Sequence, residues 1–412
     1  MSISVGLKRP ALEVADVIQE YGEAFRAKYG ALLSSTQKKA LRDLARCRTA
    51  ALGGHVEHCL DCGHERIAYN SCRNRHCPKC QALSRAHWLE RESQHLLPVE
   101  YHHVVFTLPQ EVAELALANP VVLYGLLFEA ASATLRAVAA NPKRLGAQLG
   151  VLAVLHTWAQ NLHHHPHLHC VCTGGGLSCN KHGEIDESPK WVSCRPGFFL
   201  PVRVLSRLFR GKFLAGLRNC FDQGKLKFPA QLAGLADPTS FTRWLSPLCQ
   251  KEWVVYSKPP FGGPEQVLKY LARYTHRVAI SNSRLLSLED GRVTFRYKDY
   301  ADAHQHKTMT LDALEFLRRF VQHVLPKGFV KLRHYGMLAN RQREEKLDLC
   351  RRLLLPVKVA EQLPAGAKTE VRVEPAPPCR CPKCGSQRMV SSELTAAELW
   401  ERRPAELVVD SS

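Results

Sequence analysis

The sequence has 412 residues, enough for two or three domains with cores of their own, and 45% of them are hydrophobic, so most of the chain is expected to fold. Lys and Arg number 57 against 38 Asp and Glu, and the net charge of +19 favours a polyanionic partner, with nucleic acid first. With no apolar run of about 18 residues and no apolar leader after Met1, neither a membrane span nor a signal peptide is expected.

In the first half of the chain, the sequence pattern predicts helices first and then strands that alternate with further helices. Residues 11–48 have the pattern of two amphipathic helices separated near Gly30 to Ser35, and a further helix is expected at 81–97. EYHHVVFTLP predicts a strand, and the apolar residues 119–140 predict a helix. Residues 149–158 and 167–173 predict two buried strands, joined by a His-rich loop, and Gly174-Gly175-Gly176 is expected to end the second strand.

In the second half, residues 177–250 have the pattern of an insertion that turns helical around LSRLFRGKFLAGL. EWVVYSKPPF predicts a strand, and Pro264 opens a helix expected to run to about Arg277. Short strands at 278–297, a helix at 311–324 and a strand at GFVKLRHYG follow, and the Pro- and Ala-rich residues after about 356 predict a loose tail. The pattern favours an α+β fold, in which helices flank a sheet.

Cysteines form the strongest local motif, HCLDCGHERIAYNSCRNRHCPKCQ. Each CxxC pair can place two thiolates on one metal ion, and two pairs complete a tetrahedral zinc site, which would be structural. Such pairs in a chain without a leader also favour a reducing compartment. The predicted ligands are Cys59, Cys62, Cys77 and Cys80, with Cys72, His64 and His76 as spare candidates. Cys379, Cys381 and Cys384 are interpreted as a truncated knuckle.

Basic residues border this cysteine motif. Arg73 and Arg75 are predicted to contact DNA phosphates, together with Lys79 and Arg85. The alternative is a solvated charged face without a ligand.

Histidines are concentrated in NLHHHPHLHC, residues 161–170. Because residues two apart share a face of a strand, His167 and His169 are predicted to hold a divalent metal ion together. Gln160 is the candidate for a third ligand, and this mixed donor set suits Mg²⁺ or Mn²⁺ in phosphoryl transfer. His163, His164 and His165 are expected to be loop surroundings without a role in catalysis.

KYLARYTHR offers a nucleophile for such a site. Tyr270 and Tyr274 are four residues apart and would share one face of a helix. Tyrosines at this spacing are more often half-buried core residues. Here, however, Lys269, Arg273 and Arg277 surround them with positive charge that favours DNA phosphate.

The ordered motifs HPHLHCV, the tyrosine pair and the upstream NSCRNRHCPKCQ resemble the HUH endonucleases, specifically the two-tyrosine rolling-circle insertion-sequence transposases with an N-terminal zinc-binding domain. FRYKDY (295–300) and LPKGFVKLRHYGMLANR (325–341) also resemble that family, and the resemblance covers about residues 15–345. It implies an antiparallel HUH sheet flanked by helices. It also implies metal-dependent cleavage of single-stranded DNA at the ends of the mobile element, through a 5′-phosphotyrosine on Tyr270 or Tyr274.

On this interpretation residues 1–98 form a helical and zinc-ribbon-like domain, 99–345 the catalytic domain with an insertion at about 177–250, and 346–412 a flexible tail. The expected location is the bacterial cytoplasm, at the nucleoid. Two other functions stay open: a non-catalytic zinc-ribbon regulator that binds DNA, and a transposase using carboxylates such as Asp299, Asp302 and Glu315. A decayed, inactive copy is a further alternative.

Overall fold

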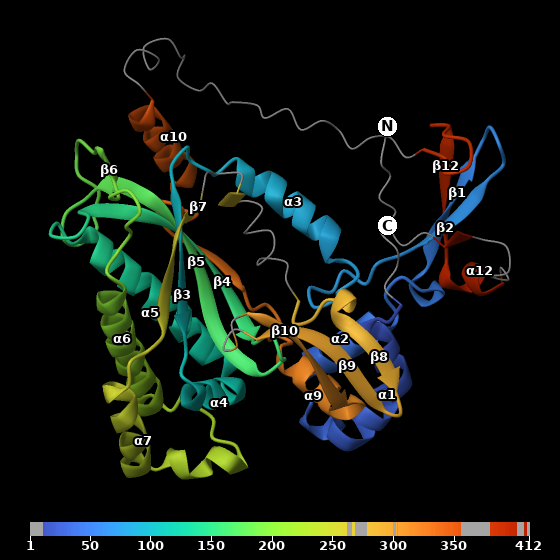
Figure 1. The fold of residues 1–412 in the computed structure, drawn as a ribbon, viewed down its shortest axis with the longest axis horizontal. Coiled ribbons are helices and arrows are strands. Elements are labelled where there is room, and N and C mark those ends of the chain that lie inside the picture. The colour runs from blue at the N-terminus through green and yellow to red at the C-terminus, as the bar shows by residue number, and fades with distance from the viewer. Residues whose placement is uncertain are drawn as a thin grey trace.

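The computed structural model describes residues 11–261, 266–267, 278–299, 302, 304–355, 380–401 and 408–409. Figure 1 shows three groups of elements: a large sheet with its helices, a smaller body of helices and strands, and a narrow ribbon that contains both early and late residues of the chain. The predicted α+β class with an antiparallel sheet is confirmed.

The large sheet has six strands in the order β11-β4-β5-β3-β7, with β6 paired to the far end of β5. Every pairing in it is antiparallel. β4 and β5 form a long hairpin in which His156 lies opposite His167. The strands are β3 (Tyr101–Thr107), β4 (Ala147–Trp158), β5 (His164–Ser178), β6 (Trp191–Ser193), β7 (Val255–Phe261) and β11 (Leu332–Gly336).

Helices cover one face of this sheet (Figure 1). Leu168 and Cys170 of β5 pack there against Phe128 and Phe209, all almost fully buried. The covering helices are α4 (Gln110–Ala118), α5 (Pro120–Ala140), α6 (Val202–Asp222) and α7 (Pro238–Gln250). By length and composition α5 could cross a membrane, but 61% of its apolar window is buried within the protein, as in a core helix. Residues 177–250, predicted as an insertion, thus contribute α6 to the main core.

The smaller body joins the start of the chain to residues 279–322. Phe25 and Leu41 of the N-terminal helices pack against Phe295 and Phe316 in one buried cluster. Its elements are α1 (Val14–Tyr29), α2 (Ser35–Ala45), β8 (Leu285–Glu289), β9 (Arg292–Asp299), β10 (Gln305–Asp312) and α9 (Ala313–Gln322). The hydrophobic cores therefore do not follow the predicted division at residues 98 and 99.

The turn of the β4–β5 hairpin connects the large sheet to this smaller body. Leu162, at the turn, is fully buried in the core of the smaller body. The guanidinium of Arg284 donates to the carbonyl of Gln160, and Nε2 of His323 lies 3.0 Å from the carbonyl oxygen of Leu162. The hairpin that carries the histidines is consequently held at its tip.

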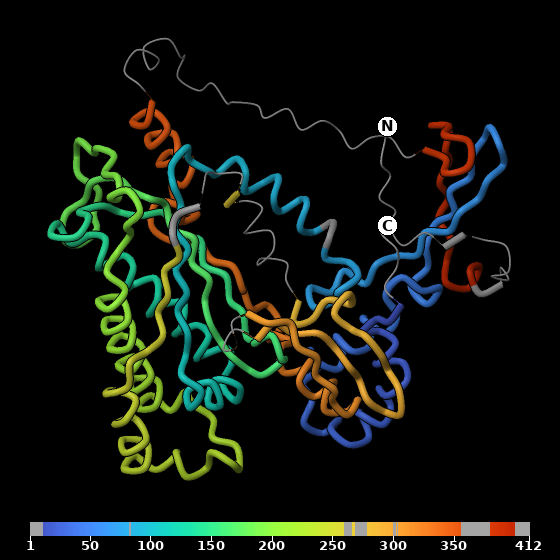
Figure 2. Tube along the Cα trace, viewed as in Figure 1, coloured from blue at the N-terminus to red at the C-terminus, as the bar shows by residue number. Residues whose placement is uncertain are grey.

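The end of the chain folds back in two places, so a loose tail is the wrong description for its described residues. α10 (Arg343–Leu354) buries Leu347 and Cys350 against Leu97 and Leu177. Farther on, β12 (Met389–Leu394) pairs antiparallel with β1 (Gly54–Cys59), as Figure 2 shows where the red strand lies beside the blue one. β2 (Glu65–Tyr69), β13 (Val408–Val409) and α12 (Ala396–Glu401) complete the ribbon.

Most predicted elements lie within a few residues of the observed ones, including α3 (Gln81–Ser93). In the described ranges, short 3₁₀ helices lie between them at Gly30–Leu32, Ala50–Leu52, Ala230–Ala236 and Asn282–Arg284. The strand end expected at Gly174 to Gly176 is wrong, because β5 continues to Ser178. A Cβ on Gly176 would lie 2.2 Å from the carbonyl oxygen of Gln148, so glycine here permits the close approach of β4 rather than a turn.

Candidate metal centres and catalytic face

The face of the large sheet opposite α5 carries a row of histidines. Odd-numbered residues of β5 point to this face, and the predicted pair His167 and His169 lies on it. His156 of β4 lies opposite His167 in the strand register, and its side chain is buried. The three rings place their nitrogen atoms within 4.8 Å of one another, and they form the histidine site.

The geometry of the histidine site fits a divalent metal ion. Nε2 of His167 and Nε2 of His169 lie 3.1 Å apart. Two nitrogen ligands about 2.1 Å from one ion and at right angles to each other would be about 3.0 Å apart. The two ring nitrogens thus converge as they would on a shared cation.

Neighbouring groups orient two of these rings. Nδ1 of His167 lies 2.7 Å from the carbonyl oxygen of His165, so this nitrogen donates its hydrogen and leaves Nε2 as an acceptor. Nε2 of His103, on β3, lies 2.9 Å from Nδ1 of His169. Burial, followed by the nearby charge of Lys258, lowers the pKa of His103 to about 3 and keeps its ring neutral. A neutral His103 can accept a hydrogen bond from His169 and fix that ring.

Gln160, the predicted third ligand, is not part of this group. It lies in the hairpin turn, and its carbonyl accepts a hydrogen bond from Arg284. His156 is the third member instead. The signal for it was the sequence LAVLHTW, in which His156 is the one titratable residue of a buried strand that pairs with the HxH strand.

The other histidines of the opening motif divide between surface and core. His163 is exposed, whereas His164 begins β5 and is buried on the α5 side. Nε2 of His164 lies 2.7 Å from the hydroxyl of Tyr124, and burial lowers the pKa of His164 to about 3. The expected loop is therefore wrong for His164 and His165, and His164 has a structural role.

Tyr270 and Tyr274, with Lys269, Arg273 and Arg277, lie outside the described residues. The described residue nearest to them in sequence is Val267, which is fully buried. Val267 belongs to a hydrophobic cluster with Trp88 of α3 and with Leu152 and Val171. Leu152 and Val171 are on the histidine face of β4 and β5, so the chain reaches this face three residues before Tyr270.

Among the described residues, cysteines gather in two groups that could each hold a metal ion, rather than in the single predicted one. Cys77 and Cys80 gather with Cys47 and Cys72, and this set is the first cysteine cluster. Cys59 and Cys62 gather instead with Cys381 and Cys384, and this set is the second cysteine cluster. The predicted ligand set is wrong because β1 and β2 carry the first CxxC pair away from the second.

The first cysteine cluster lies at the edge of the smaller body's core, where it joins the end of α2 to residues 72–80. Sγ atoms of Cys72 and Cys80 are 3.7 Å apart, and ligands about 2.3 Å from a tetrahedral zinc ion would be about 3.8 Å apart. Hydrogen bonds with the thiols of Cys72, Cys77 and Cys80 lower the pKa of Cys47. Cys47 was missed because it stands alone in sequence, 25 residues before Cys72.

The two arginines predicted to contact DNA have different environments. Arg73 is exposed and has a φ of 50°. Arg75 donates to the carbonyl oxygens of Phe329 and Pro326, at 2.6 and 2.9 Å, and burial lowers its pKa. The Arg75 guanidinium thus fastens the cysteine segment to the loop before β11, and the predicted contact of Arg75 with DNA stays a prediction.

Carboxylates do not assemble in the described part of the chain as a transposase triad would require. Lys307 pairs with both Asp299 and Asp302, at 2.9 and 2.8 Å. Glu315 pairs with Arg318 and Arg319. The three carboxylates thus form ion pairs on the surface of the smaller body and do not converge on one centre.

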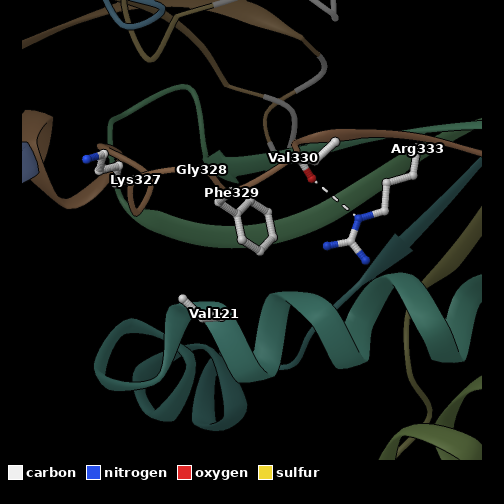
Figure 3. A pocket seen from close by; sticks show the side chains of 6 residues that line it. All are labelled: Val121, Lys327, Gly328, Phe329, Val330 and Arg333. Atoms are coloured by element: carbon white, nitrogen blue, oxygen red, sulfur yellow. Dashed lines mark hydrogen bonds between the residues drawn. The ribbon is translucent and has the colours of Figure 1, made fainter.

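A hollow of about 480 Å³ lies between the start of α5 and the loop before β11, and Figure 3 shows the side chains that line it. Val121, Lys327 and Phe329 line it, and the guanidinium of Arg333 lies 4.3 Å from the ring centre of Phe128. Arg333 points to the α5 side of the sheet, so this hollow is separate from the histidine site.

Comparison with known proteins gives consistent matches along the chain. A family described as "Putative transposase" matches residues 150–346, and one described as "Transposase zinc-binding domain" matches residues 17–108. The chain is 52% identical to the "Putative transposase y4qJ" of Sinorhizobium fredii, over 94% of this chain and 96% of that protein. It is 26% identical to the "Transposase for insertion sequence element IS801" of Pseudomonas savastanoi pv. phaseolicola, over 88% of this chain and 85% of that protein. No solved structure matches the chain.

Proposed function

The chain belongs to the family of rolling-circle HUH transposases of insertion sequences, and on this premise we propose that it cuts and rejoins single-stranded DNA at the ends of its own mobile element through a tyrosine nucleophile. The observation that carries the proposal is the convergence of His156, His167 and His169 on one face of an antiparallel sheet. As a transposase the protein is a DNA-processing enzyme, with DNA as its partner.

The donor set suggests which metal ion this site would prefer. Three imidazoles are softer ligands than the mixed set with an amide oxygen that was expected, and imidazole suits Mn²⁺ and later transition metals better than Mg²⁺. A divalent cation bound there would polarise the scissile phosphate and offset charge that develops in the transition state. We therefore expect Mn²⁺ to support cleavage at lower concentration than Mg²⁺.

Tyr270 and Tyr274 are the proposed nucleophiles. Val267 is buried on the histidine face, and three residues of chain span at most about 11 Å, so Tyr270 is within reach of that face. The phenol oxygen attacks phosphorus and forms a 5′-phosphotyrosine, while the bond to the 3′ oxygen breaks and this oxygen takes up a proton. The phosphotyrosine keeps the energy of the ester, so a later 3′-OH can rejoin the strand by the reverse step.

The open edge of the histidine face suits a single strand. Lys258 of β7 lies opposite His103 in the register and is exposed, and Tyr256 lies opposite Val105 with half of its surface exposed. A cation and an aromatic ring on one edge can contact phosphate and a stacked base, as in other single-strand binding grooves. Their position favours a strand that runs across β3 toward His169.

Cleavage of labelled single strands from the ends of the element tests this assignment. His156→Ala and His167→Ala should lower the cleavage rate at least about 100-fold at saturating DNA, because each removes one metal ligand. Gln160→Ala should stay within about threefold of the wild-type rate, because Gln160 is not one of the three converging residues and the substitution keeps the carbonyl that accepts from Arg284.

His163→Ala is the matched histidine control, because His163 is exposed. His164→Ala is unsuitable, since it would empty a buried site and leave the Tyr124 hydroxyl without its partner. Equal loss in His163→Ala and His167→Ala, or full activity in His156→Ala, would contradict the three-histidine site.

A further inference from the structure

Two copies of the same short motif meet in space although they lie at opposite ends of the sequence. CLDCG begins at Cys59 and CPKCG begins at Cys381. We propose that Cys59, Cys62, Cys381 and Cys384 bind a second structural zinc ion, which fastens the C-terminal segment 380–394 to the N-terminal zinc-binding domain. Neither Cys381 nor Cys384 lies within residues 17–108, the range of the zinc-binding family match.

The two motifs adopt the same turn. In the first, the amide of Gly63 donates to the carbonyl of Cys59 at 2.9 Å, and in the second the amide of Gly385 donates to the carbonyl of Cys381 at 2.8 Å. Both glycines have positive φ, 69° and 76°, which is the left-handed conformation that favours glycine. Each turn thus presents its two thiols in the way a zinc knuckle does.

The facing turns bring the four sulfur atoms to the spacing of a tetrahedral site. Sγ of Cys59 lies 3.6 Å from Sγ of Cys384, and Sγ of Cys62 lies 3.6 Å from Sγ of Cys381. These separations are close to the edge of about 3.8 Å that four thiolates around zinc require. They are far longer than the roughly 2.05 Å of a disulfide, so the cysteines are arranged around a shared centre and not as bonded pairs.

The surrounding ribbon holds the two turns together. Cys59, the first residue of one turn, lies opposite Met389 in the β1–β12 pairing. The amide of Leu60 donates to the carbonyl of Arg388 at 3.0 Å. The Arg388 guanidinium also pairs with Asp61 at 2.7 Å. This contact lies between the two knuckles and aligns them.

Farther along the ribbon, Val56, Ile67 and Leu399 form a small buried cluster. Such a cluster buries little apolar surface, so it supplies little stability by itself. A small fold of this kind depends on a structural metal, and four thiolates with no open position match a closed zinc site.

The cysteines of the first cluster cannot replace the tail ligands. Cys77 and Cys80 have their own partners in Cys47 and Cys72, so the described residues contain two separate and complete four-cysteine sets. The chain should therefore bind two zinc ions, one in each set. By coordinating cysteines from both ends, the second ion would close a loop of the chain from Cys62 to Cys381. This loop contains the whole proposed catalytic domain.

Zinc stoichiometry of the full-length chain tests the proposal. His167→Ala is included in every protein of this test, so that the histidine site adds no zinc ion to the count. Native mass spectrometry of protein purified under reducing conditions should then give two zinc ions for the chain with all its cysteines and one for Cys381→Ser/Cys384→Ser. Cys59→Ser/Cys62→Ser should also retain one, and the variant with all four substitutions should again retain one, because the two pairs serve the same ion. Cys249→Ser is the control and should retain two, since Cys249 is exposed and outside both clusters.

A chain with all its cysteines that binds one zinc ion, or a tail variant that keeps two, would overturn the proposal. If the tail variants do not yield folded protein, thiol alkylation of the wild type decides the question. Cys381 and Cys384 should then be protected to the same degree as Cys59 and Cys62, and chelation should expose all four together. Alkylation of the two tail cysteines at the rate of Cys249 before chelation would refute the second site.

Discussion

At the scale of single residues, the proposed metal site depends on which nitrogen of each ring faces the other histidines. His167 is fixed by the carbonyl of His165, and His169 by the ring of His103. The HxH spacing identified His167 and His169 from sequence because strand alternation is local. It could not identify His103, which lies 66 residues before His169 and meets it only through the β3–β5 pairing.

His103 should act as a positioning residue. His103→Ala should raise the Mn²⁺ concentration needed for half-maximal cleavage by about 10- to 100-fold, as is typical when a group that orients a metal ligand is lost. His103→Gln should recover most of that loss, since its amide can still hydrogen-bond to Nδ1 of His169. A titration of cleavage rate against Mn²⁺ measures the shift. An unchanged Mn²⁺ dependence in His103→Ala would contradict a positioning role for His103.

Buried neutral histidines also predict how stability depends on pH. Burial lowers the pKa of His323 to about 4, below the ordinary 6.5 that applies to the unfolded chain. Between these values the unfolded state binds the extra proton, so the contribution of His323 is complete above about pH 6.5 and is lost as pH falls toward 4. His164, with its pKa near 3, adds a change of the same sign.

His323→Gln should reduce this acid sensitivity while its amide still donates to the carbonyl of Leu162. The slope of unfolding free energy against pH between 4.5 and 6 should fall by up to about 1.4 kcal/mol per pH unit, the value for one proton. Urea unfolding at several pH values measures the slope, and an unchanged slope would contradict a neutral His323 in the fold.

At the scale of elements, hydrophobic spacing predicted β3, β4, α5 and α9 closely, because each has an apolar pattern of its own period. Hydrophobic spacing did not predict the structure where contacts between distant parts of the chain determine it. The glycines of β5 signal a turn in isolation, yet they admit the neighbouring backbones within a strand. Likewise, no local pattern shows that α1 packs against β9 and α9 from the far part of the chain.

Gly176→Ala should destabilise the β4–β5 hairpin, because its Cβ would lie 2.2 Å from the carbonyl oxygen of Gln148. We expect a loss of about 2–4 kcal/mol, as for other strained backbone positions. Gly125→Ala is the matched control: Gly125 lies inside α5 with nothing within 4 Å of the added Cβ, so it should gain about 0.5–1 kcal/mol. Chemical denaturation measures both, and equal stability of the two variants would contradict the close approach.

At the scale of the whole molecule, the chain's early and late segments are interleaved. The smaller body contains α1 and α9, and the ribbon contains β1 and β12. The hairpin turn fixed by Arg284 and His323 ties the histidine face to this body. Sequence motifs were sufficient to identify the family, because the order of the motifs along the chain can be read without knowing the fold. The assignment of cysteines to two clusters needed the fold, since cysteine pairing depends on which distant strands meet.

Capture of a covalent protein–DNA adduct is the decisive experiment for the tyrosine nucleophile. Labelled single strands from the ends of the element would be incubated with the full-length chain and Mn²⁺, then separated on a denaturing gel. We expect a labelled adduct that requires the metal ion, persists in one or both of Tyr270→Phe and Tyr274→Phe, and disappears in the double variant. An adduct that survives the double substitution, or strand cleavage without any adduct, would contradict the tyrosine mechanism.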